Sequence, residues 1–457
     1  MITNVAAKLG IDKAIGYTVL SRVIQAGGGV VLILLISLFL TEAEQGYYYT
    51  FGSVLAIQIF FELGLNTIIT QYVAHEAAHL RWLSASEISG DPVNISRISS
   101  LLRFSIKAFS VLAMVLFVVL QTAGHIFFSK FQASTIQWQI PWQTVAISTS
   151  LMLIVNPILA FLEGLGKVKE VARIRLIQQI VNIVAIASAL VGKGGLMALG
   201  VGSLLSFCVL LGGVLLPENR KIIFSIYRRK EEWDISYWKE IFPYQYKVAL
   251  SWISGYFIFQ LFNPVIFAVE GPVAAGQMGM TWAALNGISA LSMSWINTKV
   301  PLFSSYIAKK DYGSLDSVFG VTVKQLISVN VILVAGFIAF IIGLSQFGFP
   351  LADRFLKPLP IILLTLTVVA NQLIFSWATY LRCHKQEPYL VNSLIGGVLC
   401  AASTLLLGRE VGLMGIVTGY TALTLFVGLP WAFLVFKTKK AEWHSGTLSD
   451  IKIETNG

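Results

Sequence analysis

Residues 323–345 read VKQLISVNVILVAGFIAFIIGLS, a nearly unbroken apolar stretch with one lysine close to its start. A helix needs about 20 apolar residues to cross the hydrocarbon core of a bilayer. Segments of this kind cover most of the chain, so the sequence predicts an all-α polytopic membrane protein. We expect about 12 transmembrane helices of this length, over residues 15–40, 46–70, 101–123, 142–162, 174–192, 195–216, 243–269, 273–298, 323–345, 359–381, 388–407 and 411–436.

The composition agrees with this interpretation. Hydrophobic residues make up 56% of the chain and charged residues 12%, about half the charged share of a soluble domain. The three cysteines, Cys208, Cys383 and Cys400, form no disulfide framework, and we expect free thiols. The first apolar segment is too long for a cleaved signal peptide, so we interpret it as the first span.

The basic residues predict the orientation of the chain. If the N-terminus is cytoplasmic, the outer loops hold few of the 33 lysines and arginines, namely Lys130, Lys193, Arg354, Lys357 and Arg409. The positive-inside rule therefore favours a multi-pass protein with both termini in the cytoplasm. The net charge of +10 then reflects inner loops that face anionic membrane lipids. No separate basic domain is left to bind nucleic acid.

The longest inner loop divides the chain into two halves. We predict an N-terminal six-helix lobe over 1–216, a cytoplasmic linker over 217–242, a C-terminal six-helix lobe over 243–436 and a cytoplasmic tail over 437–457. The halves also share a pattern, because QYVAHE at 71–76 follows the second span and SYIAKK at 305–310 follows the eighth. Six spans per half give corresponding helices the same orientation, so the repeat would be parallel.

One short motif points to metal chemistry. His75-Glu76-Ala77-Ala78-His79 is a literal HExxH, which on a helix presents two histidines to zinc and a glutamate as general base. No third ligand stands at a suitable spacing, and the repeat-related positions hold Lys309 and Lys310. We therefore interpret this segment as a polar helix exit and expect neither a metal site nor catalytic residues.

Several spans carry polar residues at helical spacing. An intramembrane charge costs about 2.5–3.5 kcal/mol, so such a residue normally faces a partner or a hydrated cavity. When several spans carry polar residues, these mark a substrate pathway more often than they serve only to hold helices together. The pattern favours a hydrated cavity with a basic bias. Its candidate lining residues are Arg22, Gln25, Glu62, Asn66, Lys107, Gln178, Lys247 and Asn286.

Arg22 and Glu62 lie at similar depths in the first two spans. Each is about eight residues from the inner end of its helix, or roughly 12 Å at 1.5 Å per residue. Consecutive helices are usually neighbours, so we expect the two side chains to meet. Two roles are open: a structural ion pair, or a site in which Arg22 binds an anionic substrate and Glu62 holds it or exchanges a proton.

The first hairpin resembles a known family. The segments TEAEQGYYYTF at 41–51, FFELGL at 60–65 and QYVAHE at 71–76 look like the start of bacterial oligosaccharide flippases. These are the O-antigen and polysaccharide exporters of the multidrug/oligosaccharidyl-lipid/polysaccharide (MOP) superfamily. The motifs cover about the first 80 residues, whereas the later helices carry none that is specific.

The resemblance implies two six-helix lobes in a V shape around a central cavity. It also implies that the protein flips a polyprenyl-diphosphate-linked oligosaccharide from the cytoplasmic to the periplasmic leaflet by alternating access. Arginine and lysine suit a diphosphate. The chain has no Walker motif, so a coupled proton or sodium ion, or consumption of the product, would drive transport. Partners would include a polysaccharide polymerase and glycosyltransferases; no other cofactor is expected.

Two alternatives remain open at this point. A multidrug antiporter of the same superfamily would export organic cations and would need acidic cavity residues. A membrane enzyme would need either a third ligand beside His75 and His79, as in an intramembrane zinc metalloprotease, or paired carboxylates, as in a polyprenyl-linked glycosyltransferase. The sign of the charge in the cavity would distinguish the antiporter from the flippase. A metal assay on the purified protein would test the metalloprotease.

The predicted topology has a direct test. Lys130→Cys and Lys357→Cys should react with a membrane-impermeant maleimide only from outside, because both positions fall in outer loops. Lys437→Cys is the matched control and should be protected until the membrane is opened. Labelling of the first two variants from the cytoplasmic side would reverse the topology.

Overall fold

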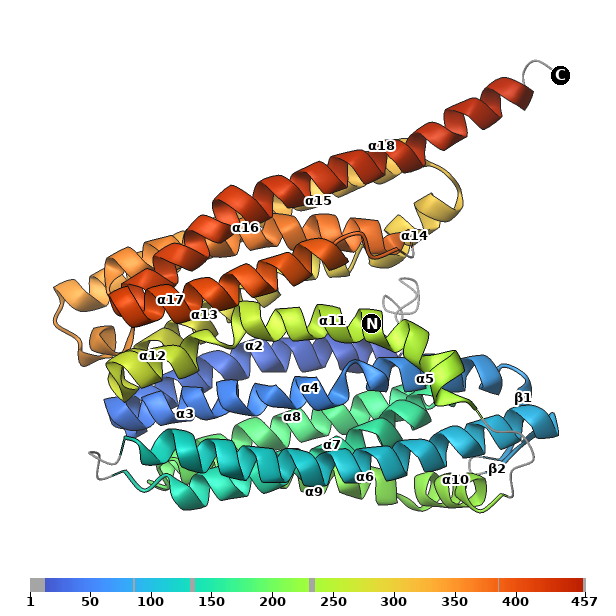
Figure 1. The fold of residues 1–457 in the computed structure, drawn as a ribbon, viewed down its shortest axis with the longest axis horizontal. Helices are drawn as coiled ribbons and strands as arrows, with labels where there is room; N and C mark the ends of the chain where they lie inside the picture. Colours follow the sequence, from blue (N-terminus) through green and yellow to red (C-terminus); the bar gives the residue numbers. More distant parts are fainter. Residues whose placement is uncertain (1–12, 85–86, 132–135, 230–234, 385, 455–457) are drawn as a thin grey trace, which may run out of the picture. The chain divides into compact units, whose positions relative to one another are not determined.

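The computed structural model describes residues 13–84, 87–131, 136–229, 235–384 and 386–454 (Figure 1). Contacts divide the chain into two units, Met1–Ile253 and Ser254–Gly457. The division falls within helix α11 (Phe242–Phe259), beyond the linker predicted at 217–242. Each unit is described by itself below.

The first unit consists of helices joined by short turns and one β-hairpin. Its elements are α2 (Lys13–Phe39), α3 (Glu42–Leu55), η1 (Ala56–Gln58), α4 (Ile59–Glu62), α5 (Leu65–Ala77), β1 (Leu80–Ser84), β2 (Glu87–Gly90), α6 (Pro92–Ser129), α7 (Gln139–Gly164), α8 (Val168–Val191), α9 (Met197–Leu215), α10 (Pro217–Tyr227), the π-helical turn η2 (Tyr237–Ile241) and the start of α11.

The second unit is helical throughout its described residues. After the end of α11 it contains α12 (Phe262–Glu270), α13 (Pro272–Asn297), α14 (Val300–Ala308), α15 (Tyr312–Gln346), η3 (Pro350–Arg354), α16 (Pro358–Cys383), α17 (Leu390–Ala422), η4 (Leu423–Gly428) and α18 (Leu429–Glu454). Gly412 interrupts α17 with a φ of 69°. The Glu270 carboxylate accepts a hydrogen bond from the Leu413 N–H at 2.5 Å and so caps the helix that restarts there.

The predicted polytopic helical fold is confirmed. Every expected apolar segment overlaps one or more of these helices, and 9 helical segments of the described chain are long and apolar enough to cross a membrane. The number is smaller than predicted for two reasons. Two expected spans, in α2 and α13, are not among the nine, and two others are counted as one segment, Leu390–His444, despite the interruption at Gly412.

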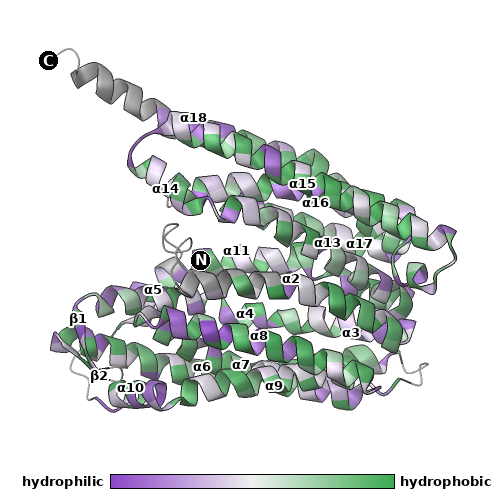
Figure 2. Ribbon diagram, turned by 180° about the vertical axis from the view of Figure 1, so that it is seen from behind, coloured by the Kyte–Doolittle hydropathy of each residue, from purple (hydrophilic) through white to green (hydrophobic). Residues whose placement is uncertain are grey.

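One small element departs from the all-α prediction. Strands β1 and β2 form an antiparallel hairpin, with Arg81 opposite Ser89 and Trp82 opposite Ile88. Water can satisfy the outer backbone groups of such a hairpin, so it belongs outside the hydrocarbon region. Figure 2 shows polar residues gathered around this hairpin and α10, and apolar residues along the long helices.

Local capping explains where several helices begin. Thr41 and Glu44 form a reciprocal capping box at the start of α3, with bonds of 3.2 and 2.8 Å between side chains and backbone N–H groups. The Asp91 carboxylate caps α6 by accepting from the Val93 N–H, and the Asp311 carboxylate caps α15 by accepting from the Ser314 N–H. These caps satisfy backbone donors that a helix leaves without partners.

The core of the first unit is aromatic. Tyr47 and Phe51 of α3, Phe128 of α6 and Trp142 of α7 are each at most 1% exposed. The ring of Phe51 lies 5.0 Å from that of Phe128 and 5.1 Å from that of Trp142. A Cβ at Gly124 would collide with the Trp142 indole, so the absence of a side chain there lets α6 and α7 approach. This cluster holds three consecutive long helical segments together.

The second unit is held by a core at one end of its helices. Phe303, Leu326 and Leu381, from α14, α15 and α16, are fully buried there, and Ala432 of α18 joins them. Beside this core, the Asp316 carboxylate accepts a hydrogen bond from the Tyr380 hydroxyl and pairs with Lys440 Nζ, both at 2.8 Å. The pairing fastens α18 to α15 and α16.

Candidate functional site

The second predicted span is not one helix. The helical path through α3, η1 and α4 ends at Glu62, and Leu63 and Gly64 are both left-handed, with φ of 46° and 71°. Helix α5 then begins at Leu65. A Cβ at Gly64 would collide with Val248 of α11, and Trp252 is also within 3.9 Å. The predicted span over 46–70 is present within the membrane-spanning segment Glu42–Ala77, but its helix is broken at Leu63 and Gly64. The close approach of α11 favours glycine at the break.

Three polar side chains meet at this break. The Gln58 amide donates a short hydrogen bond to Glu62 Oε1, and Asn66 Nδ2 donates to Oε2 at 3.4 Å. All three are half-buried, but Asn66 Oδ1 is fully buried and has no hydrogen-bond partner among the residues that the structure describes. The break therefore gathers a carboxylate and two amides in the middle of a predicted span.

The other predicted cavity residues lie on several helices. Gln25 (α2), Lys107 (α6), Lys247 (α11) and Asn286 (α13) are exposed, and Gln178 (α8) is half-buried. Within the described part of the chain, Glu62 and Asn66 are the only members of the predicted set that bond to one another. The side chain of Arg22 lies outside the described residues, so its approach to Glu62 stays a prediction.

A polar contact between α2 and α8 was missed by sequence reasoning. The Ser21 hydroxyl donates to Gln179 Oε1 at 2.6 Å. The prediction chose Gln178, but the adjacent Gln179 makes the contact. A helix position one residue away points about 100° around the axis, so spacing alone could not separate the two.

A second cluster of charges lies at the other end of α5. Arg97 of α6 bonds the Glu76 carboxylate through Nε at 2.9 Å and the Glu240 carboxylate through Nη2 at 2.5 Å. The Tyr72 hydroxyl donates to the Glu240 backbone carbonyl. One guanidinium thus joins α5, α6 and the turn η2, using the forked geometry that suits two carboxylates.

The environment of Glu240 favours its charged form. Burial raises the pKa of the Glu240 carboxyl, but the hydrogen bonds from Arg97 and from the Ser236 N–H lower it by more. The pKa therefore lies below its ordinary value. The pair with Arg97 is most stable where both groups are ionised.

The same cluster explains the HExxH sequence. Glu76 is 6% exposed and turned toward Arg97, whereas His75 and His79 are exposed, with ring centroids 6.3 Å apart. Across the described residues no three His, Cys, Asp or Glu side chains are placed to hold a metal ion. The glutamate that a metalloprotease would use as base instead pairs with an arginine.

Helix α6 also binds the segment that follows α10. Arg103 Nε donates to the Tyr227 carbonyl at 2.9 Å and its Nη2 to the Arg229 carbonyl, while the Ser99 hydroxyl donates to the Ile226 carbonyl at 2.7 Å. These bonds fasten the end of α10 to α6.

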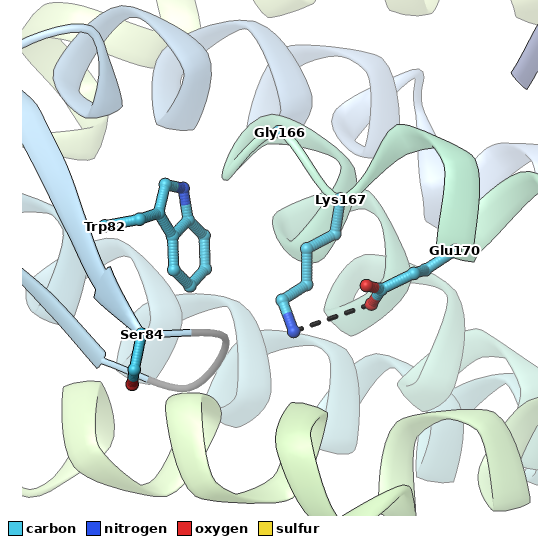
Figure 3. Close-up of a pocket in the computed structure, with 5 residues that line it drawn as sticks. All are labelled: Trp82, Ser84, Gly166, Lys167 and Glu170. Carbon is cyan, nitrogen blue, oxygen red and sulfur yellow. Dashed lines mark ion pairs between the residues drawn. The ribbon is translucent and has the colours of Figure 1, made fainter.

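A shallow pocket of about 260 Å³ lies between the hairpin and the α7–α8 turn (Figure 3). Lys167 points into it and is 8% exposed. Its Nζ bonds Asn219 Oδ1 at 3.1 Å, pairs with Glu170 at 3.5 Å and lies 5.6 Å from the Trp82 ring centroid. The lysine is therefore satisfied by the protein, and it joins α8, α10 and β1.

In the second unit, the polar residues inside the spans bond across helices. Asn371 of α16 donates to the Tyr420 hydroxyl of α17 at 3.0 Å, and Asn330 of α15 donates to the Ser292 hydroxyl of α13 at 3.1 Å. Interhelical bonds of this kind hold membrane helices together. They do not form a cluster comparable to that at Glu62.

Comparisons with known proteins identify the fold. No protein-family model matches the sequence, and no curated protein matches it. Among solved structures, an inward-facing multidrug resistance MATE family transporter of the MOP superfamily matches with a TM-score of 0.57 and 13% identity, covering 89% of this chain and 98% of its own. The lipid II flippase MurJ, in an inward closed conformation, matches with a TM-score of 0.58 and 11% identity over 96% and 91%.

A further match is a MOP superfamily transporter from Pyrococcus furiosus, for which a reversed polarity of the binding pocket suggests a different function. Its TM-score is 0.52 at 13% identity, over 92% of this chain and 94% of that one. At such identities the likeness shows the fold alone. The chain thus has the fold of MOP superfamily transporters and flippases, and these solved relatives are transport proteins rather than enzymes.

The histidine motif yields one prediction. His75→Ala and His79→Ala together should leave function and thermal stability close to those of the wild type, because both side chains are exposed and Glu76 is paired elsewhere. Metal analysis of the purified protein is the measurement. Stoichiometric zinc in the wild type that disappears in the double variant would overturn this interpretation.

The cluster of Arg97, Glu76 and Glu240 yields a second prediction. Arg97→Ala leaves the buried Glu76 carboxylate without its partner, so we expect a loss of about 2–4 kcal/mol in the free energy of unfolding. The melting temperature of the purified protein in detergent measures it. Arg81→Ala, an exposed arginine on the hairpin, is the matched control; equal melting temperatures for the two variants would contradict the assignment.

The lowered pKa of Glu240 makes the contribution of this cluster to the stability of the fold depend on pH. A carboxyl with a lowered pKa stabilises the fold above its ordinary pKa of about 4.3, and loses that contribution as the pH falls through the lowered value. Glu240→Gln should therefore lower the melting temperature at neutral pH, and the difference from the wild type should shrink in acid. A difference that does not change with pH would exclude this role.

Proposed function

We propose that this protein flips a polyprenyl-diphosphate-linked oligosaccharide, an O-antigen or other polysaccharide repeat unit, from the cytoplasmic to the periplasmic leaflet by alternating access. The observation that carries the proposal is the shared fold with a lipid II flippase over nearly the whole chain. The proposal places the chain in a bacterial inner membrane, beside the glycosyltransferases and polymerase that make and use its substrate.

The charge of the predicted transport path supports a negatively charged substrate. Arg22, Lys107 and Lys247 are basic residues of predicted spans, whereas Glu62 is the one clear carboxylate in the middle of a span. A diphosphate is recognised by charged donors, best of all by the forked guanidinium of arginine. In this proposal Arg22 binds the diphosphate, and amides such as Gln25 and Gln178 bind sugar hydroxyls.

A multidrug antiporter is the second candidate, because MATE transporters share the fold equally well. Glu62 favours it, since an organic cation needs an intramembrane carboxylate. In the Pyrococcus transporter, a binding pocket of reversed polarity suggests a different function for that protein. The sign of the charge that the substrate carries is accordingly the property to test.

Complementation of a flippase-deficient strain tests the role of Arg22. Arg22→Lys keeps the charge but loses the fork, and Arg22→Gln loses both. Both variants should insert normally yet fail to restore surface polysaccharide, with Arg22→Gln the weaker. Lys130→Gln, in a predicted outer loop, is the matched control and should restore it fully.

The double variant Arg22→Gln, Glu62→Gln separates substrate binding from a structural ion pair. If Arg22 binds the diphosphate, the double variant stays inactive. Full restoration of transport on removal of both charges would show that the pair is structural. Ethidium export by the wild type, without any restoration of polysaccharide, would favour the antiporter.

A further inference from the structure

We infer that residues 437–444 of α18, called the α18 extension below, form a pH-sensitive latch on the ends of α15 and α16. The latch is closed while His384 and His444 are neutral, and it opens when these two histidines are protonated. The device is a regulatory contact outside the membrane spans. It does not depend on the proposed function, because it serves a flippase and an antiporter alike.

The α18 extension lies beyond the apolar part of its helix. It reads KTKKAEWH, with three lysines and a glutamate, a composition that belongs in water rather than in hydrocarbon. It meets the first turns of α15, which begins at Tyr312, and the last turn of α16, which ends at Cys383. In the predicted topology these helix ends face the cytoplasm, so the latch would respond to the pH there.

One carboxylate organises the closed latch. Asp316 of α15 accepts a hydrogen bond from the Tyr380 hydroxyl and pairs through Oδ2 with Lys440 Nζ, both at 2.8 Å. The His444 ring stacks on that of Tyr312, with centroids 4.1 Å apart, and its Nδ1 lies 3.9 Å from the same Asp316 Oδ2. A lysine and a histidine of the extension thus face one carboxylate oxygen.

Hydrogen bonds determine which nitrogen of neutral His444 carries the hydrogen. Because the Tyr380 hydroxyl donates to Asp316, it accepts the bond from His444 Nε2 at 3.2 Å. The neutral ring therefore carries its hydrogen on Nε2 and none on Nδ1. Protonation at Nδ1 would bring a second cation to Asp316 Oδ2, where it would compete with Lys440 for one oxygen.

His384 is also held in a form that disfavours protonation. Its Nδ1 donates to the Tyr380 carbonyl at 3.2 Å, so Nε2 is the nitrogen without hydrogen. This Nε2 is buried and has no hydrogen-bond partner among the residues that the structure describes. Trp443 of the extension packs on the imidazole, with centroids 4.6 Å apart. A proton on Nε2 would create a buried donor without an acceptor there, which is costly unless the covering ring moves away.

The titratable and charged groups around the two rings come from α15, α16 and α18. Besides the histidines themselves they are Asp316, Tyr312, Tyr380, Cys383 and Lys440. Burial lowers the pKa of the His384 imidazole by more than the Tyr380 carbonyl and the Asp316 charge raise it. A lowered pKa stabilises the closed latch above the ordinary histidine value of about 6.5. That contribution is lost as the pH falls through the lowered value.

Opening the latch would change the end of the second unit. Trp443 and Phe436 of α18 pack against the buried core that includes Leu381. Release of the extension would remove the Trp443 packing and the Lys440 pair, while the bond between Tyr380 and Asp316 can stay. The inner ends of α15 and α16 would then be held together by fewer contacts.

Hydrogen–deuterium exchange of the purified full-length protein in detergent tests the latch. The measured quantity is the protection of backbone amides in a peptide that covers 437–444, corrected for the effect of pH on intrinsic exchange. Protection should fall by about tenfold or more between about pH 7.5 and about pH 5.5, the range in which histidine titrates. A peptide around Leu326, in the buried core, is the internal reference and should stay protected.

Variants assign the effect to the two histidines. His384→Phe keeps an aromatic ring against Trp443, and His444→Gln keeps a donor for the Tyr380 hydroxyl, but neither replacement ionises. The double variant should therefore stay protected at both pH values, and each single variant should narrow the difference. His79→Gln, at an exposed histidine of the first unit, is the matched control and should respond as the wild type does.

Asp316→Asn tests the contact itself. It removes the charge that pairs with Lys440, so the extension should be less protected even at neutral pH. Should the double histidine variant fail to close at neutral pH, His444→Gln decides by itself, because it leaves the Trp443 packing intact.

The inference fails if protection of the extension does not change with pH in the wild type, or if the histidine variants keep the full response. It also fails if the reference peptide loses protection together with the extension, since acid would then unfold the unit rather than open a latch. None of these outcomes depends on the substrate. Failure to restore surface polysaccharide would count against the proposed function alone.

Discussion

The constraint behind this structure is that a bilayer core offers no hydrogen bonds to the backbone. Each peptide group there must be satisfied within the protein, and helices do this with the fewest long-range contacts. Elements that break the rule therefore need a local explanation. The hairpin β1–β2 and the turn η2 lie at helix ends, and the interruption at Gly412 is capped by Glu270. The break at Leu63 and Gly64 falls within a span.

Outside the spans, charged side chains fasten the helix ends. Arg97 joins α5 and α6 to η2, Arg103 joins α6 to the end of α10, and Lys167 joins α8 to α10 and β1. These residues are part of the excess of basic residues from which the orientation was predicted. In the predicted orientation, the same positive charge serves topology during insertion and rigidity after folding, because loops outside the spans remain in water, where ion pairs carry no insertion cost.

Sequence reasoning located the helices but not their interruptions or their partners. Apolar length predicts a span because the bilayer thickness sets it. By contrast, the pairing of Arg97 with Glu240 joins residues 143 positions apart, and no local pattern encodes it. The contact that leaves no room for a Cβ at Gly64 comes from Val248, which is also remote in the sequence. The spacing of Gln58, Glu62 and Asn66 did indicate a common face, since residues four apart are neighbours on a helix.

The hydrogen-bond partners of Glu62 bear on the role of this carboxylate inside a span. Polar residues that hold helices together form hydrogen bonds between different helices. Thr70 of α5 donates such a bond to the Ala160 carbonyl of α7, and Asn371 of α16 donates one to the Tyr420 hydroxyl of α17. Both described partners of Glu62 belong to its own span. The carboxylate therefore bears the cost of its position, about 2.5–3.5 kcal/mol on insertion scales, and the bonds that are described join only consecutive elements of one span, η1, α4 and α5. Among the described residues, association between different spans does not account for that cost, so the predicted approach of Arg22 is the contact that would decide what Glu62 does there.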